Sequence, residues 1–171
     1  MSIAPRILRT KRLVVREAET QDAPFLLQLM NDPDWHRFIG DRGVRDVAAA
    51  GDYIEQRVRA AYATDGMGMR VVTIDNKPIG LCGINQRDYL DDADIGFAFL
   101  PEYRRAGYAF EACAEILTLA KDVVGLKQLI AITLPSNKAS HGLLEKLGFV
   151  FRRILPPDAD GDELALFQRA L

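Results

Sequence analysis

One stretch near the middle of the chain, residues 103–109, constrains the fold more than any other feature of the sequence. It reads Tyr-Arg-Arg-Ala-Gly-Tyr-Ala and follows residues 95–100, an apolar run of aromatic and branched side chains that is typical of a strand. Beyond it, apolar residues recur at helical spacing, at Ala109, Ala112, Cys113, Ile116, Leu117, Ala120 and Val124. The sequence therefore predicts a strand, a basic turn that contains glycine, and an amphipathic helix in direct succession.

The start of that helix is suited to binding an anion. The first N–H groups of a helix have no partner within the helix, and the positive end of the helix dipole lies there. Arg104 and Arg105 add positive charge, and Gly107 lets the backbone approach a ligand closely. Neither Gly-x-x-x-x-Gly-Lys-Ser/Thr nor Gly-x-Gly-x-x-Gly occurs in the chain, which excludes two other phosphate-binding motifs. We call residues 103–109 the cradle and predict that it binds an anionic group.

Three sequence motifs resemble motifs of one protein family. The pattern Arg-x-x-Gly-x-Ala at residues 104–109 resembles the acyl-CoA-binding signature of the GNAT (GCN5-related N-acetyltransferase) family, in which this turn holds the pyrophosphate of coenzyme A. A second match lies downstream, with Asn-Lys-Ala-Ser at residues 137–140 and Glu-Lys-Leu-Gly-Phe at residues 145–149. Residues 10–16, Thr-Lys-Arg-Leu-Val-Val-Arg, resemble the opening of the ribosomal-protein-alanine acetyltransferase (RimJ/RimL-like) branch. The resemblance extends over residues 10–169.

The order of the β-rich runs predicts the centre of the fold. Runs at residues 69–74, 79–84 and 93–100 are joined by short polar turns, so they are expected to form consecutive antiparallel strands. The helix after the cradle leads into a further run at 127–134, and such a strand-helix-strand unit crosses over into a parallel pairing. With the resemblance, this implies an α/β fold of the α+β type: a mixed, mainly antiparallel sheet of about seven strands, splayed at the parallel pair and flanked by about four helices.

A strand, two helices and an irregular segment are predicted before residue 69. Residues 13–16 are expected to form the strand, and Thr20 is expected to cap the first helix, which ends at residues 31–34. The second helix carries apolar residues at helical spacing, namely Val47, Ala50, Ile54, Val58 and Ala61. Between the helices, residues 35–43 mix aromatic and charged side chains, and such a segment is expected to cover a cleft.

The C-terminal part is expected to form one short helix and two strands. Ser136 or Asn137 is expected to cap the helix, and Gly148 to close it. The strands are predicted at residues 149–155 and 163–169, joined by a polar loop that is rich in proline and aspartate.

Length and composition predict one soluble domain over residues 1–171. The chain has 171 residues, 49% of them hydrophobic and 27% charged, values that suit a globular protein with its own core. A net charge of -2 argues against a nucleic-acid partner. The N-terminus lacks the apolar segment of a secretory signal and no apolar run reaches transmembrane length, so a cytoplasmic location without membrane contact is expected.

The cysteines and histidines indicate neither a disulfide nor a metal. Cys82 lies in a strand-like run and Cys113 on the apolar face of a helix, so both are expected to be buried free thiols in a reducing compartment. His36 and His141 lack paired metal-ligand spacing, and no metal is expected. His141 is expected on the exposed side of the short helix.

The resemblance implies direct transfer of an acetyl group from acetyl-CoA, as co-substrate, to a primary amine. The expected acceptor is the α-amine of a protein N-terminus; the alternatives are a small amine of the polyamine or antibiotic type, and a non-catalytic CoA-binding module. The partners are then acetyl-CoA and the amine acceptor, and the protein acts as a monomer or homodimer. Acceptor specificity is expected to reside in residues 35–45, where Trp35 either lines the entrance with His36 or is a buried anchor, and in the loop at 156–161.

The resemblance also implies residue roles, each of which has a structural alternative. Asp94 accepts the proton of the amine through water, or is a solvated residue at a strand end. Asn137 contacts the pantetheine arm or the reacting groups, or caps its helix and nothing more. Ser140 hydrogen-bonds the leaving sulfur, or satisfies the local backbone. Many members use a tyrosine to protonate this sulfur, but the matching position here is Leu144, which has no proton to donate. The predicted catalytic residues are Asp94, Asn137 and Ser140.

The donor site implied by the resemblance lies along the strand before the cradle and in the cradle itself. A bulge in that strand is expected to leave backbone groups free for pantetheine, with an N–H around Phe97 or Ala98 stabilising the oxyanion. The predicted cofactor-binding residues are Phe97, Ala98, Phe99, Leu100, Arg104, Arg105, Ala106, Gly107, Tyr108, Ala109, Asn137 and Ser140.

Overall fold

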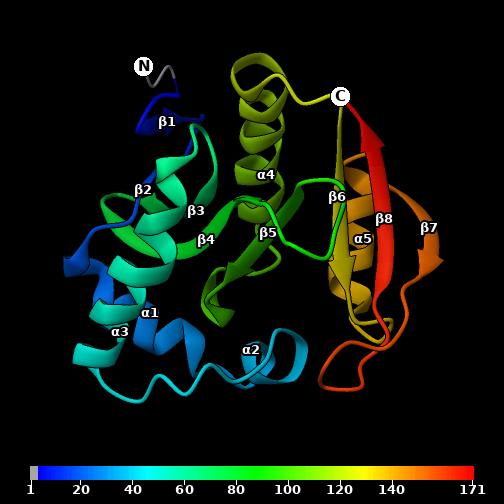
Figure 1. Cartoon of the computed structure of the whole chain (residues 1–171). Coiled ribbons are helices and arrows are strands. Elements are labelled where there is room, and N and C mark those ends of the chain that lie inside the picture. The colour runs from blue at the N-terminus through cyan, green and yellow to red at the C-terminus, as the bar shows by residue number, and fades with distance from the viewer. Residues whose placement is uncertain (1–3) are drawn as a thin grey trace.

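The computed structural model describes residues 4–171 and contains one sheet in the order β1-β2-β3-β4-β5-β6-β8-β7 (Figure 1). The strands are β1 (Ile7–Arg9), β2 (Val14–Glu17), β3 (Gly68–Ile74), β4 (Lys77–Asn85), β5 (Asp94–Phe99), β6 (Gln128–Thr133), β7 (Val150–Ile154) and β8 (Ala165–Ala170). All neighbours pair antiparallel except β5 and β6, which pair parallel. The predicted mixed sheet is therefore confirmed, and β1, a three-residue strand beside β2, is the strand that the prediction missed.

Five α-helices flank the described part of the sheet. They are α1 (Ala23–Met30), α2 (Pro33–Phe38), α3 (Val47–Tyr53), α4 (Tyr108–Thr118) and α5 (Lys138–Lys146). A π-helical turn (Ile54–Val58) and a 3₁₀ turn (Arg59–Ala63) continue α3, and a second π-helical turn (Leu119–Val124) continues α4. None of the described helices combines the length and the apolar composition that crossing a membrane requires.

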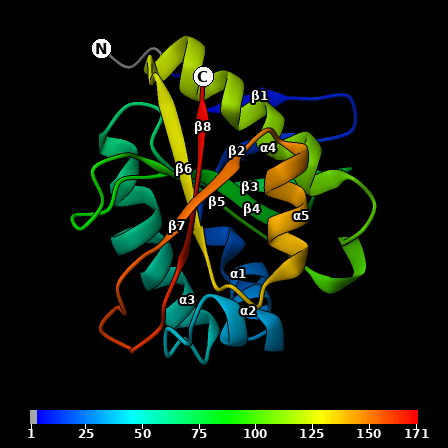
Figure 2. The same ribbon diagram turned by 90° about the vertical axis from the view of Figure 1, so that its right-hand side faces the viewer.

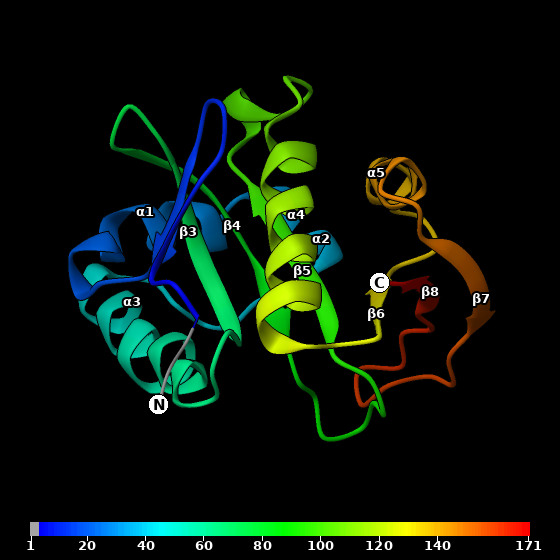
Figure 3. The same ribbon diagram turned by 90° about the horizontal axis from the view of Figure 1, so that it is seen from above.

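The sheet separates two hydrophobic cores. Val71 and Val72 are neighbours in β3, yet they pack into different cores, because successive side chains of a strand point to opposite faces. The core on the Val72 side contains α4 and α5, and the core on the Val71 side contains α1, α2 and α3. Figure 3 shows α1 and α3 on one side of strands β3 to β5 and α4 on the other, and Figure 2 shows α5 beside β6, β8 and β7.

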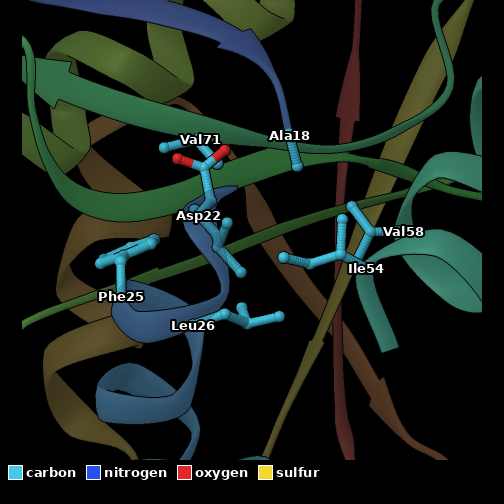
Figure 4. Close-up of a pocket in the computed structure, with 8 residues that line it drawn as sticks. Ala18, Asp22, Phe25, Leu26, Ile54, Val58 and Val71 are labelled. Carbon is cyan, nitrogen blue, oxygen red and sulfur yellow. The ribbon is translucent and has the colours of Figure 1, made fainter. Parts of the chain in front are cut away.

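The core on the α1–α3 side is closely packed. Figure 4 shows Leu26 of α1 facing Ile54 and Val58, which follow α3, with Val71 of the sheet above them. The space that these side chains enclose is too small for a water molecule. This layer therefore supports the sheet and offers no room for a ligand at this point.

The N-terminal helices begin at other residues than predicted. Thr20 is not a helix cap: it lies in a 3₁₀ turn (Thr20–Asp22), and α1 starts after Asp22. Residues 31–34 do end α1, but Asp32 caps a new helix, α2, by accepting a hydrogen bond from the N–H of Asp34 at 3.2 Å. Proline at the first position of a helix is favourable, since the missing N–H has no partner there in any case. The prediction treated Pro33 as a stop signal and so missed α2.

The predicted C-terminal helix and two strands are confirmed as α5, β7 and β8, while the order of the strands in the sheet was not predicted. The strand β8 inserts between β6 and β7, although β7 precedes it in the chain. After α5, Gly148 has a φ of 85°, a conformation that suits glycine at the end of a helix, and Phe149 behind it is buried. Cys82 and Cys113 are buried free thiols as predicted, with their Sγ atoms 3.5 Å apart.

Candidate functional site

The cradle connects β5 to α4 and presents a row of unpaired N–H groups. Gly107 immediately precedes α4 with a φ of 82°, and Arg105 also has a positive φ, 62°. The N–H of Glu111 donates to the carbonyl of Gly107, whereas the N–H groups of residues 105–110 donate to no acceptor in the part of the chain that the structure describes. Such a concave run of free donors at the positive end of a helix is suited to binding an anion.

Arg12 also belongs to this site, although no role was predicted for it. Its Nη1 donates to the carbonyl oxygen of Ala106 at 3.1 Å, its Nε to Glu111 at 2.7 Å, and its guanidinium lies 4.5 Å from the ring centre of Tyr108. Burial tends to raise the pKa of Glu111, but hydrogen bonds from Thr10 and Arg12 outweigh it and hold that pKa below its ordinary value. The carboxylate is therefore neutralised by Arg12 and opposes an anion less strongly. The run at residues 10–16 was the available signal for this contact.

The guanidinium of Arg104 is not free to face the cradle. Its Nη2 donates to Asp32 at 2.7 Å, its Nη1 to Asp34 at 2.6 Å, and its Nε to the carbonyl oxygen of Phe99 at 2.9 Å. The expectation that the Arg104 charge serves an anion in the cradle is therefore corrected, because carboxylates already neutralise it. Arg105 is exposed and forms no ion pair with a described residue, so its charge remains available.

The two edges of β5 differ in their pairing. Along one edge, β5 pairs with β4 without interruption from Gly80↔Phe99 to Asn85↔Asp94. Along the other edge, the pairing with β6 is limited to Asp94↔Ile130. The predicted splay of the parallel pair is thus present, and it begins one residue into β5.

The hydrogen-bond alternation of the antiparallel ladder decides which backbone groups face this splay. The N–H of Leu100 donates to the carbonyl of Ile79 at 3.0 Å, and hydrogen-bonded positions recur at every second residue, so Ala98 also bonds to β4. Phe97 and Phe99 direct their N–H and C=O groups to the opposite side, toward β6. The N–H groups of Ala98 and Leu100 are therefore unavailable to a ligand, and the N–H groups of Phe97 and Phe99 are the donors that face the splay.

Asp94 lies at the closed end of the splay and is 1% exposed. The alternative of a solvated strand-end residue is therefore wrong. The Nε of Arg87, in the loop between β4 and β5, donates to Asp94 Oδ1 at 2.9 Å. Burial raises the pKa of Asp94, and the charge and hydrogen bond of Arg87 offset this only in part, so the pKa stays above its ordinary value. A carboxylate whose pKa is raised in this way accepts a proton more readily than an ordinary aspartate does.

The short helix α5 starts on the other side of the splay. Asn137 is its N-cap, since its Oδ1 accepts a hydrogen bond from the N–H of Ser140 at 3.2 Å. The side-chain amide of Asn137 and the hydroxyl of Ser140 donate to no described residue, so the alternative that Ser140 satisfies the local backbone is not observed. Leu144 is buried in the core beneath α5. No tyrosine stands at that position to donate a proton.

The segment expected to cover the acceptor side is partly helical, as α2. Trp35 is 9% exposed and packs in the α1–α3 core, which confirms it as a buried anchor. His36 Nε2 lies 3.8 Å from Asp41, beyond hydrogen-bond distance. His141 is not on the exposed side of its helix: its ring contacts Phe167 with centroids 5.0 Å apart, and its Nε2 lies 3.2 Å from the carbonyl oxygen of Leu134.

A groove of about 490 Å³ runs between α4 and α5. Phe110 and Leu117 of α4 line one side, and Lys146, Leu147 and Arg169 line the other. It combines apolar walls with positive charge on the same face as α4 and the cradle. Among the described residues, no group of three or more His, Cys, Asp or Glu side chains is arranged to hold a metal ion.

Together, the splayed parallel pair, the anion-binding helix start and the buried carboxylate define a class, the acyltransferases that take their acyl group from a phosphate-bearing thioester. The chain belongs to the GNAT acetyltransferase family: the family model described as "Acetyltransferase (GNAT) domain" matches residues 12–150. This confirms the resemblance read from the motifs, and the protein is accordingly an N-acetyltransferase.

Two curated relatives and one solved structure illustrate the similarity. The chain is 29% identical over 146 residues to the uncharacterized N-acetyltransferase p20 of Bacillus licheniformis, with 83% of this chain and 81% of the relative covered. It is 26% identical over 147 residues to the uncharacterized N-acetyltransferase YoaA of Bacillus subtilis, with 84% and 82% covered. RimL, a ribosomal L7/L12 alpha-N-protein acetyltransferase solved with coenzyme A, shares the fold with a TM-score of 0.84 at 15% identity, with 96% and 98% covered.

Proposed function

We propose that the protein, acting as one GNAT unit over residues 1–171, transfers an acetyl group from acetyl-CoA to the α-amine of a protein N-terminus. The single observation that carries the donor assignment is the free edge of β5 ending in the cradle of unpaired N–H groups. The fold shared with RimL, a ribosomal L7/L12 alpha-N-protein acetyltransferase, supports the acceptor class.

The residues of this chain divide the work of holding the donor. The N–H groups of residues 105–110 bind the pyrophosphate, with Arg105 supplying charge nearby and Arg12 neutralising Glu111. The free N–H of Phe97 lies on the splayed edge and donates to the carbonyl oxygen on which negative charge develops. Acetyl-CoA itself supplies a thioester whose carbonyl carbon bonds to the amine nitrogen and whose C–S bond breaks.

Two further groups handle protons. Asp94 accepts the proton that the amine loses, through a bridging water, because its carboxylate is buried and its pKa is raised. Ser140 offers a hydroxyl without a described protein partner at the start of α5, and this hydroxyl hydrogen-bonds the leaving sulfur. The side-chain NH₂ group of Asn137 also donates to no described residue, and it contacts the donor while the Oδ1 atom of the same side chain caps the helix.

The energetics favour an α-amine over a lysine side chain. An amine must be neutral to attack, and at pH 7 this costs about 1.4 kcal/mol for an α-amine of pKa near 8 but roughly 4.6 kcal/mol for lysine. A single carboxylate that acts through water is adequate for the smaller cost. An acceptor panel of peptides with free N-termini, polyamines and aminoglycosides would distinguish the acceptor classes. If the protein acetylates polyamines alone, the acceptor is a small amine and not a protein N-terminus.

Isothermal titration with acetyl-CoA tests the donor site. We expect saturable binding by the natural protein and a loss of about tenfold or more in affinity for Gly107→Val, because a side chain there crowds Arg12 Nη2 and the approach to the cradle. Gly125→Val is the matched control: its φ of 79° imposes similar backbone strain, but its surroundings are open and lie at the far end of the helix. Absence of binding at high micromolar acetyl-CoA would remove the proposal.

The second candidate is a CoA-binding module without catalysis. The specific observation in its favour is the buried Leu144 at the position where a tyrosine acid is expected. Release of the CoA thiol in the presence of candidate amines distinguishes the two, since the module would bind acetyl-CoA without consuming it.

A further inference from the structure

Arg104 connects the cradle to a helix that lies about seventy positions earlier in the chain. Three of its nitrogens are used: Nη2 by Asp32, Nη1 by Asp34 and Nε by the carbonyl oxygen of Phe99. Asp32 is the N-cap of α2 and Asp34 lies in its first turn. A planar guanidinium binds several acceptors in fixed geometry, which a point charge such as lysine does not reproduce. The contacts therefore position α2 relative to the free edge of β5.

The helix α2 lies across the wide end of the splay. In Figure 1 it sits below the space between β5 and the lower ends of β6 and α5, and Figure 3 shows it between α4 and α5 as well. Its Trp35 packs with Leu100, which immediately follows β5, in the core on the α1–α3 side. An element in this place forms a wall on the side of the splay opposite to α4 and α5.

This wall contains polar groups that lack partners. The Nε1 of Trp35 and the Nε2 of His36 are both buried and form no hydrogen bond with a described residue. Buried polar groups are hydrogen-bonded in the great majority of cases, so unpaired ones are expected to meet a partner that binds there. Of the two, Trp35 packs in the α1–α3 core, whereas the side chain of His36 is half-buried, and its Nε2 lies 3.8 Å from Asp41. His36 is therefore the residue of α2 that an acceptor can approach.

We propose that Arg104 is a positioning residue that holds α2 as the acceptor-side wall, rather than a residue that binds the donor. The proposal rests on the proposed function, because it assigns the donor to the cradle and the acceptor to the opposite face.

Two measurements on Arg104→Gln, Arg104→Lys and Arg105→Gln test the assignment. Trp35 is the single tryptophan of the chain, so quenching of its fluorescence by acrylamide reports the packing of α2. Titration with acetyl-CoA reports the donor site. We expect both Arg104 variants to bind acetyl-CoA within about threefold of the natural affinity while Trp35 becomes more accessible to acrylamide. Arg105→Gln, the matched control, is expected to weaken acetyl-CoA binding and leave Trp35 unchanged.

The opposite pattern would overturn the proposal. If Arg104→Lys, which keeps the charge, or Arg104→Gln loses as much acetyl-CoA affinity as Arg105→Gln, or if Trp35 quenching does not change, Arg104 does not act through α2. Should Arg104→Gln fail to fold, Asp34→Asn removes one contact of Arg104 at a half-exposed carboxylate, and its effects on acetyl-CoA binding and Trp35 quenching test the same assignment.

In a peptide assay, Arg104→Gln is expected to raise the KM for a peptide with a free N-terminus far more than it lowers kcat. If the natural protein binds no acetyl-CoA, the proposed function fails, whereas the Trp35 measurement still decides the role of Arg104.

Discussion

Two buried aspartates in different layers of the molecule each pair with an arginine, but they are held in different ways. Both oxygens of Asp22 accept hydrogen bonds from the guanidinium of Arg16, each at 2.8 Å, and the N–H of Glu19 adds another at 2.8 Å. Asp94 accepts one guanidinium hydrogen bond, from the Nε of Arg87 at 2.9 Å. The first carboxylate is saturated within the supporting layer, and the second lies at the start of the splay.

The difference shows how burial and hydrogen bonding together separate a structural carboxylate from a reactive one. The bidentate pair at Asp22 joins β2 to the turn before α1 and raises the pKa of Arg16, chiefly through its hydrogen bond to Asp22. At Asp94 the contacts with Arg87 and Asn85 do not offset burial, so the pKa is raised. A base for catalysis needs this incomplete compensation, because a saturated carboxylate has no reason to take up a proton.

Breaking the saturated pair is expected to have the largest effect. Asp22→Ala leaves the partly buried charge of Arg16 without its partner, and we expect a loss of about 3 kcal/mol in the free energy of unfolding. Urea denaturation measures this loss, and Asp91→Ala, in an exposed loop, serves as the control. A loss below about 1 kcal/mol would show that Asp22 is no more important to the fold than an ordinary surface residue.

A substitution of similar size at the splay is expected to affect activity rather than stability. We expect Asp94→Asn to lower kcat/KM by roughly 10² to 10⁴ because the proton acceptor is lost. The free energy of unfolding should stay within about 1 kcal/mol, since the amide fills the same space. Thiol release with the best amine of the acceptor panel measures the first quantity and urea denaturation the second. Full activity in this variant would exclude Asp94 as the base.

The partner of Asp94 should control the pH dependence of the reaction. Arg87 is the one charged group that lowers the pKa of Asp94, and a hydrogen bond with the polar side chain of Asn85 in β4 lowers it as well. The neighbour of Asp94 in β6 is the apolar Ile130. In Arg87→Gln this charge is gone, so the pKa of Asp94 rises further and the acidic limb of the kcat/KM profile moves upward by about one pH unit. The activity at high pH is expected to recover. A limb that stays in place in Arg87→Gln but vanishes in Asp94→Asn would contradict the role of Arg87.

The smallest expected effect is on stability as a function of pH. Because the pKa of Asp94 is raised in the folded state, its contribution is fully present below the ordinary value of 3.8 and is lost as pH rises through the folded pKa. The stability difference between the natural protein and Asp94→Asn should therefore shift against the natural protein as pH rises above that value. Urea midpoints of both proteins across this range measure the shift, and a constant difference would mean that the pKa is not raised.

Sequence reasoning succeeded where the physical cause is local. The cradle was recognisable because unpaired N–H groups belong to any helix start, and Gly107 just before it lets a ligand approach the backbone closely. The capping by Asn137 and the glycine at position 148 follow from the same short-range rules. The helix α2 was missed because Pro33 is as compatible with the first position of a new helix as with the end of an old one.

The partners of the charged residues could not be predicted in this way. Arg104 stands beside the cradle in sequence, yet its guanidinium reaches carboxylates in α2. Arg12 lies far from the cradle in sequence and contacts it in space. A long side chain finds its partner according to which elements pack beside it, and sequence spacing carries little information about that.

By itself, the sequence determined the kind of donor site, because the strand, the basic glycine turn, the helix and the later Asn-x-x-Ser motif all follow from local backbone chemistry and spacing. The tertiary structure alone decided which groups in that site are free. Pairing with β4 uses the N–H groups of Ala98 and Leu100 and leaves that of Phe97, and α2 takes the charge of Arg104 and leaves that of Arg105. The physical reason is that a hydrogen-bonding group is available to a ligand only if the folded chain has not already given it a partner.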